Sequence, residues 1–404
     1  MSRRAAFAFT FLLCTSAFGA DEPQWLKDAR ARESKSLKPA EIRSQDGWFK
    51  ARTPGKPVNK IEKVEGSYSV ELDIGGDAGV HCEVFPDGVD LANTLRVTLE
   101  NTFKDIESSQ GKIEARALEG RSAGSYGAVP YLTLTWLYRV STPEGPRVGS
   151  FKQFIMEKGK AGVYCAHNDL GFSRTFTTIS QAFAESLETQ EPSAVPHFVE
   201  ISTARISGAT IGVAVSTLER DSEGDTKARQ MTAMLIATND GAVQSEDSTQ
   251  IHWVRPDGSL INAVSTDASN GELSNSLTLK EDDGTWIVEG EVQGKAVKTT
   301  LPKDARPGNW VAQAHQLRAL MAEPNPVGRE HNMGIWIAEN PEKLTLARTR
   351  ILTKGDKQFT ARGDIGSISA NLTLDKTSGT ASAADIRVGP VNMNLERVYV
   401  SGSP

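Results

Sequence analysis

The second half of the chain consists of short alternating segments that are separated by Gly-containing turn signals. Three of these signals are Asn239-Asp240-Gly241, Pro256-Asp257-Gly258 and Asp282-Asp283-Gly284. Because such turns join neighbouring antiparallel strands, the repeated turn signals predict a succession of β-hairpins. Strands are expected over residues 199–206, 210–218, 229–237, 333–338, 344–353, 358–362, 368–374 and 391–400.

One helix is expected to interrupt this β-rich half. Pro307 suits a first-turn position, and Pro324 and Pro326 stop the helix. The apolar residues between these prolines fall on one helical face: Trp310, Val311, Ala314, Leu317 and Met321.

The first half shows a different order of patterns. A strand over 68–74 is followed by a helix over 91–106, strands over 131–140 and 148–157, and a helix over 172–187. This order is typical of helices packed on an antiparallel sheet. The predicted fold class is α+β. An α+β sandwich over 61–190 precedes a mostly antiparallel, half-barrel-like domain over 197–404, and 188–196 is the expected linker.

The N-terminus carries the three parts of a secretory signal peptide over residues 1–20. Arg3 and Arg4 give a positive start, residues 5–13 are apolar, and small residues follow. Leu13 before Cys14 does not suit a lipidation motif. Residues 21–60 form a charged arm that is either mobile or docked through Trp48 and Phe49. We therefore predict export to the periplasm or the extracellular space, and no later segment is apolar enough to cross a membrane.

Two resemblances follow from these patterns. Residues 206–220, with Gly208 and Gly212 in a first hairpin, and the helix near 301–321 make the second half similar to exported half-barrel proteins related to bacterial lipoprotein carriers. In such folds a curved sheet wraps a helix and leaves an apolar cavity. The order of elements in the first half resembles the PsbP-like fold.

Composition excludes one class of partner. The formal net charge is −6 with both signs interspersed, and the chain has no basic stripe. These features, with a pI of 5.7, oppose nucleic-acid binding.

The stretches "AGVHC" and "AGVYC" contain Cys82 and Cys165, the only cysteines after the leader. Together with His81 and His167 they first suggest a zinc site. Adjacent residues of a strand point to opposite faces, so His81 and Cys82 cannot readily bind one ion. A single pair of cysteines in an exported chain favours a disulfide, which stabilises by about 4 kcal/mol for a long loop. Whether the two stretches reflect a duplication stays open.

No catalytic or cofactor motif withstands inspection of its context. "AGSYG" (123–127) nearly matches a nucleophile elbow, but a strand follows Ser125, so we interpret it as a hairpin loop. "DIGGDAG" (73–79) is interpreted as a loop, and "DSEGD" (221–225) as a hairpin tip rather than a calcium loop. No metal and no cofactor are predicted.

Four tryptophans of the second half are candidates for lining an apolar pocket, with simple core filling as the alternative: Trp253, Trp286, Trp310 and Trp336. The leading hypothesis is a non-enzymatic envelope protein that binds a lipid, a lipidated chain or another envelope protein. The alternatives are a secreted hydrolase with a site assembled from separate strands, and a structural or adhesive surface module. The ligand and the oligomeric state stay open.

Overall fold

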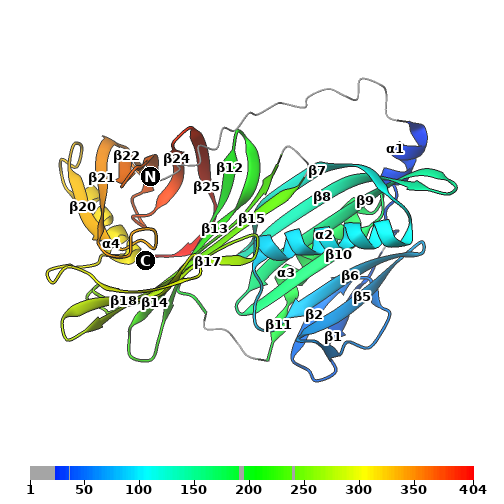
Figure 1. Cartoon of the computed structure of the whole chain (residues 1–404), viewed down its shortest axis with the longest axis horizontal. Coiled ribbons are helices and arrows are strands. Elements are labelled where there is room, and N and C mark those ends of the chain that lie inside the picture. Colours follow the sequence, from blue (N-terminus) through cyan, green and yellow to red (C-terminus); the bar gives the residue numbers. More distant parts are fainter. Residues whose placement is uncertain (1–22, 36, 191–194, 239–241) are drawn as a thin grey trace.

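The computed structural model describes residues 23–404 except 36, 191–194 and 239–241. The predicted signal peptide and the predicted turn at 239–241 therefore lie outside the described residues. The fold is mostly antiparallel β, as expected, with four helices in the described part of the chain (Figure 1). These helices are α1 (Gln24–Arg30), α2 (Leu91–Ser109), α3 (Ser173–Ser186) and α4 (Trp310–Ala322).

An eight-stranded antiparallel sheet occupies the first half of the chain. The strands lie in the order β3-β5-β6-β10-β9-β8-β7, and β4 pairs with β5. Their bounds are β3 (Lys56–Pro57), β4 (Lys63–Val64), β5 (Ser67–Gly75), β6 (Ala78–Phe85), β7 (Ile113–Tyr126), β8 (Val129–Thr142), β9 (Gly145–Lys158) and β10 (Ala161–Asn168).

The charged arm docks on this sheet through a small sheet of its own. Strands β1 (Pro39–Arg43), β2 (Phe49–Pro54) and β11 (Glu188–Thr189) pair in the order β1-β2-β11. Phe49 is buried and packs edge-on against Tyr68, and Trp48 stacks on the same ring. Of the two alternatives for residues 21–60, the described residues of the arm therefore fit the docked one.

A fourteen-stranded antiparallel sheet occupies the second half of the chain, in the order β19-β18-β17-β16-β15-β14-β13-β12-β25-β24-β23-β22-β21-β20. Its first strands are β12 (Phe198–Ile206), β13 (Ala209–Arg220), β14 (Thr226–Ala237), β15 (Val243–Val254), β16 (Leu260–Ser269), β17 (Glu272–Asp282), β18 (Thr285–Val292) and β19 (Lys295–Thr300). Its last strands are β20 (Glu330–Ile335), β21 (Thr345–Lys354), β22 (Gln358–Ile365), β23 (Ile368–Asp375), β24 (Ala381–Val388) and β25 (Val391–Gly402).

Both sheets contribute to one hydrophobic cluster. Helix α2 and strands β7 and β8 pack against one face of β12–β15, and Leu95, Trp136, Ile201 and Val213 belong to the cluster formed there. The opposite face of the eight-stranded sheet is covered by α3 and by β2, through Phe183 and Phe49. The division into domains at 188–196 stays a prediction.

Helix α4 covers the other face of the large sheet (Figure 1). Val311 packs with Phe198, Leu218 and Ala228 near the middle of the sheet. Leu317 and Met321 pack with apolar residues of β21–β23: Ile351, Phe359, Ala361 and Leu374. The fourteen-stranded sheet therefore buries apolar side chains on both faces. One face packs against α2 and the eight-stranded sheet, and the other packs under α4.

Three local expectations are corrected by the structure. Ser125 lies within β7, and the hairpin turn comes after it at Gly127. Pro307 precedes the helix instead of opening it, because Asn309 is the N-cap of α4. Strand β24 was not expected at all, since small residues dominate its first half.

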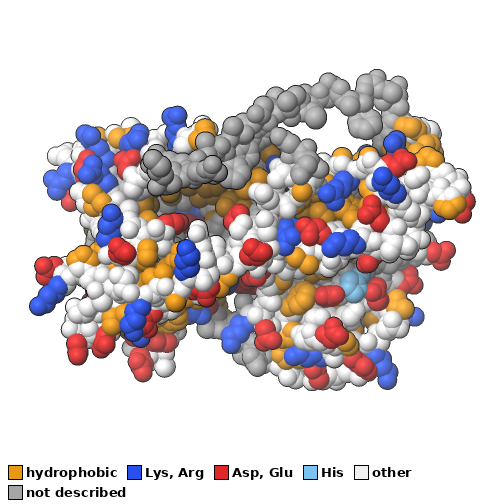
Figure 2. All heavy atoms as spheres, in the orientation of Figure 1, with side chains coloured by type: hydrophobic (Ala, Val, Ile, Leu, Met, Phe, Trp, Pro, Cys, Tyr) orange, Lys and Arg blue, Asp and Glu red, His pale blue; other side chains and the backbone are white. Residues whose placement is uncertain are grey.

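The surface carries charges of both signs. On the face shown in Figure 2, Lys and Arg side chains are interspersed with Asp and Glu over much of the molecule. No helix within the described residues is long and apolar enough to cross a bilayer.

Candidate ligand site beneath helix α4

A pocket of about 210 Å³ lies between α4 and the large sheet. The helix contributes Trp310, Gln313, Ala314 and Leu317. Glu200 of β12 lines it as well, and strands on both sides of β12 contribute further residues: Ser216 and Gln230 from one side, Thr349, Leu372 and Leu374 from the other. Two distant parts of the sheet thus meet across the helix.

An apolar strip leads away from this pocket along β22–β25. Directly opposed residues of an antiparallel pair point to the same face, and Leu374 marks the face under α4. Alternation and register then place eight further apolar residues on that face: Ile365, Ile368, Leu372, Ile386, Val388, Val391, Met393 and Leu395. We call these eight residues the apolar strip.

Exposure increases along the apolar strip with distance from α4. Leu374 is buried under the helix, and Leu372, Met393 and Leu395 are half-buried. At the hairpin turns that end the strip, Ile368 is 40% exposed and Val388 is 49% exposed. An apolar surface that continues from a core into solvent is a feature of binding sites.

On the same face of β13–β16, a polar row lies beside the apolar pair Leu218 and Ala228. The register places Ser216, Gln230, Gln250 and Ser265 in one row across four strands. Thr232 lies on the same face, opposite Ser248. The candidate site therefore has a polar wall on one side of β12 and an apolar wall on the other.

A half-buried charged cluster lies where the two walls meet. Glu200 Oε2 accepts a hydrogen bond from Thr380 Oγ1 at 2.6 Å and from Arg397 Nη1 at 3.2 Å. Arg397 Nη2 donates to Asp375 Oδ2 at 2.7 Å. Burial raises the pKa of Glu200 above its usual value, and the bonds from Thr380 and Arg397 oppose that rise. Of the three charged residues, Glu200 lines the pocket.

The four tryptophans singled out from the sequence do not converge on one cavity. Trp310 lines the pocket beneath α4, and its Nε1 is buried without a partner among the described residues. Trp286 and Trp336 share a separate core cluster under β16–β18. Trp253 on β15 is half-buried. A role of these residues in ligand binding stays a prediction.

A second pocket, of about 580 Å³, lies at the N-terminal end of α4. Trp286 and Met333 line it together with charged residues of both signs, among them Arg255 and Glu281. The side chain of Asn309 caps the helix at this point, since its Oδ1 accepts a hydrogen bond from the Ala312 amide at 2.9 Å.

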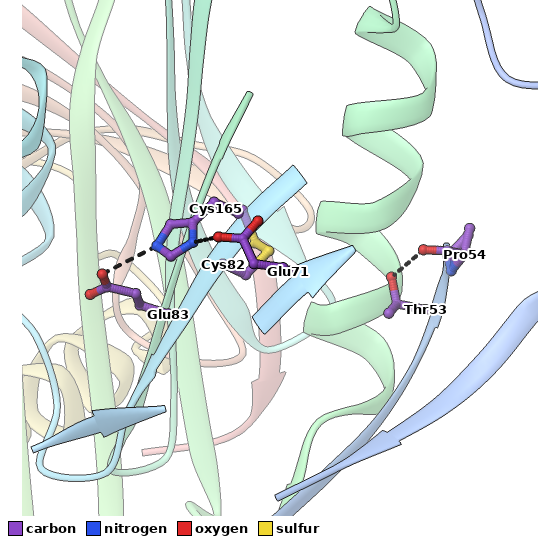
Figure 3. The surroundings of a disulfide bond; sticks show 7 residues. Thr53, Pro54, Glu71, Cys82, Glu83 and Cys165 are labelled. Atoms are coloured by element: carbon purple, nitrogen blue, oxygen red, sulfur yellow. Dashed lines mark hydrogen bonds and ion pairs between the residues drawn. A yellow bond between two sulfur atoms is a disulfide. The ribbon is translucent and has the colours of Figure 1, made fainter. Parts of the chain in front are cut away.

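The cysteines lie in the eight-stranded sheet and line neither of these two pockets. Cys82 of β6 and Cys165 of β10 are directly opposed and form a disulfide (Figure 3). His81 projects from the other face, where its Nδ1 lies 2.5 Å from Glu71 Oε1 and its Nε2 lies 3.3 Å from Glu83 Oε1. Hydrogen bonding to Glu83, and then to Glu71, raises the pKa of His81 above its ordinary value.

The histidine beside the second cysteine is also used structurally. His167 Nδ1 lies 2.8 Å from the Gly79 carbonyl oxygen, and its ring packs against Phe172 and Phe176. Within the described residues, no group of three or more His, Cys, Asp or Glu side chains is arranged to hold a metal ion.

The acidic stretch at 221–225 forms a hairpin tip. Asp221 Oδ1 accepts hydrogen bonds from the Glu223 and Asp225 amides, both at 2.9 Å. This carboxylate therefore stabilises the turn, as the hairpin-tip interpretation required.

Comparison with known proteins adds little. No family model matches the chain, and no curated protein matches it. Among solved structures, a β-barrel-like protein of domain of unknown function DUF1849 from Brucella abortus matches with a TM-score of 0.39 and 11% identity. The match covers 51% of this chain and 97% of that one. A likeness this weak carries no inference, and the resemblances to lipoprotein carriers and PsbP-like proteins stay predictions.

The sequence contains a signal for the apolar strip. Residues 386–395 alternate apolar and polar around Gly389, so that Ile386, Val388, Val391, Met393 and Leu395 mark one face of a hairpin. Alternation identifies the face, but it does not reveal that the face stays partly open.

Proposed function

We propose that this protein binds a single-chain amphiphile in the groove beneath α4, with the hydrocarbon chain along the apolar strip. The observation that carries the proposal is the continuity of the strip from the buried core at Leu374 to the half-exposed Val388. The pocket beneath α4 is smaller than the 300–1,000 Å³ typical of compact ligands. A thin chain that lies mostly along the strip suits these dimensions better than a compact molecule.

The proposal includes the finer layout expected from the sequence, in which the large sheet acts as a half-barrel around its helix. It also keeps the expected export of the chain, because the Cys82–Cys165 disulfide suits an oxidising compartment. A soluble envelope protein that carries a lipid or receives a lipidated chain fits this combination.

The hydrolase alternative has less support. Both ring nitrogens of His81 face carboxylates, and no serine takes part in that cluster. Ser265 Oγ and His252 Nδ1 lie on adjacent strands of the polar wall's face, but each is without a partner among the described residues. The alternative of a structural or adhesive module finds no specific contact in its favour.

Isothermal titration calorimetry with decanol tests the proposal. The wild-type chain should bind decanol saturably. Met393→Asp places a charge on the strip and should weaken binding at least about tenfold, because the chain then contacts a hydrated carboxylate. Asn392→Asp, one residue away on the opposite face, is the matched control and should bind like wild type. No saturable heat with wild type, or equal binding by the Met393 variant, would sink the proposal.

A further inference from the structure

We infer that the pocket beneath α4 selects amphiphiles with an uncharged or cationic hydrogen-bonding head group and rejects carboxylates. This inference rests on the proposed function, because it assigns the head group of the same ligand. The apolar strip favours any hydrocarbon chain equally. Discrimination among amphiphiles must therefore come from the polar end of the groove, where the strip meets the charged cluster.

The charge of that cluster is unbalanced toward the negative. Glu200 and Asp375 share the single guanidinium of Arg397. The side chains of Glu200 and Arg397 are only 13% and 11% exposed, so water screens them weakly. A second carboxylate entering this pocket would meet a net negative cluster at low dielectric, which costs far more than the same approach in water.

Arg397 is not free to attract an anion. Its two terminal nitrogens are already bonded to Glu200 and Asp375, and the pocket lining contains Glu200 but not Arg397. A head group that enters the pocket therefore contacts the carboxylate of Glu200 and not the guanidinium of Arg397.

The other polar groups of the pocket suit a hydroxyl, an amide or an amine. Trp310 Nε1 is a buried donor without a partner among the described residues, and Glu200 is an acceptor. Gln230 and Ser216 are each able to donate and accept. A hydroxyl offers one donor and two acceptor sites, whereas a carboxylate offers acceptors alone.

The test compares three ligands of equal chain length: decanol, decylammonium and decanoate, each titrated calorimetrically at pH 7.5. We expect decanol and decylammonium to bind the wild-type chain at least about tenfold more tightly than decanoate, equivalent to about 1.4 kcal/mol. Glu200→Gln should reduce the ratio of decanol to decanoate affinity to within about threefold by strengthening decanoate binding.

Asp375→Asn is the matched control. It removes one negative charge from the same cluster and weakens the bond to the same partner, Arg397. Because Asp375 does not line the pocket, the affinity ratio should fall clearly less than in Glu200→Gln. An equal loss of selectivity in both variants would overturn the assignment to Glu200.

The outcomes separate the two proposals. If no ligand binds, both the proposed function and this inference fail. If all three bind wild type with similar affinity, or decanoate binds more tightly than decylammonium, the chain-binding function stands and the inference is overturned. The wild-type ranking decides this even if the Glu200 variant does not fold.

Discussion

At the scale of single residues, Asp247 is the clearest source of pH dependence. This β15 carboxylate accepts hydrogen bonds from the Ala92 and Asn93 amides at the start of α2, at 3.0 Å and 2.9 Å. Burial nevertheless raises its pKa to about 6. Because the folded pKa exceeds the ordinary value of 3.8, the free energy of unfolding falls as pH rises from about 4 to about 6.

Asp247→Asn should remove this dependence. The variant carries no charge to desolvate, although its single amide oxygen can accept from only one of the two helix amides. Its stability relative to wild type should therefore increase by about 2 kcal/mol from pH 4 to pH 7.5. Urea unfolding at both pH values measures it. Asp105→Asn is the control, since Asp105 is an exposed carboxylate of the same helix, α2. A difference between variant and wild type that does not change with pH would contradict the assignment.

Sequence reasoning at this scale worked where the decisive geometry is local. Alternation within one strand separated His81 from Cys82, and the structure confirms the disulfide between Cys82 and Cys165. The Asp247 contacts could not be predicted in the same way. The partners of Asp247 lie at the start of α2, which packs on the eight-stranded sheet. No local sequence pattern links residues so distant in the chain.

At the scale of elements, α4 depends on its N-cap. Asn309 is 1% exposed, its Oδ1 accepts from the Ala312 amide, and its Nδ2 donates to the Gly258 carbonyl at 3.0 Å. Asn309→Ala removes the cap and leaves buried backbone groups unpaired, so it should cost about 2 kcal/mol of unfolding free energy. Asn309→Ser keeps an acceptor for the Ala312 amide and should cost less. Equal losses in chemical denaturation would mean that the cap itself contributes nothing.

Elements were predictable where side chains mark one periodic face. The amphipathic stripes of α2 and α3 and the alternation of β5 and β8 lie within a few residues of the expected ranges. Strand β24 and the strand conformation of Ser125 were missed, because Ala, Ser and Gly give no periodic signal. Their conformation is decided by the neighbouring strands with which they pair.

At the scale of the whole molecule, the sequence did not reveal that one cluster joins the two sheets. Val199, Ile201 and Val213 point away from α4 and toward α2 and β8. A strand that is buried on both faces has apolar residues on both faces, and its sequence does not reveal which element covers each face. The groove beneath α4 was predicted as a cavity near Trp310, but its polar and apolar walls come from strands far apart in the chain.

The ion pair between Glu157 of β9 and Arg229 of β14 tests whether the two sheets unfold together. The side chain of Glu157 is 11% exposed, so Glu157→Gln leaves the guanidinium without its buried counter-charge and should cost on the order of 3 kcal/mol. Because both sheets share one cluster, hydrogen exchange should show equal losses of protection in β9 and in the distant β22. Glu144→Gln breaks an exposed pair and should cost less than about 0.5 kcal/mol. Loss of protection confined to one sheet would show instead that residues 61–190 and 197–404 unfold as separate domains.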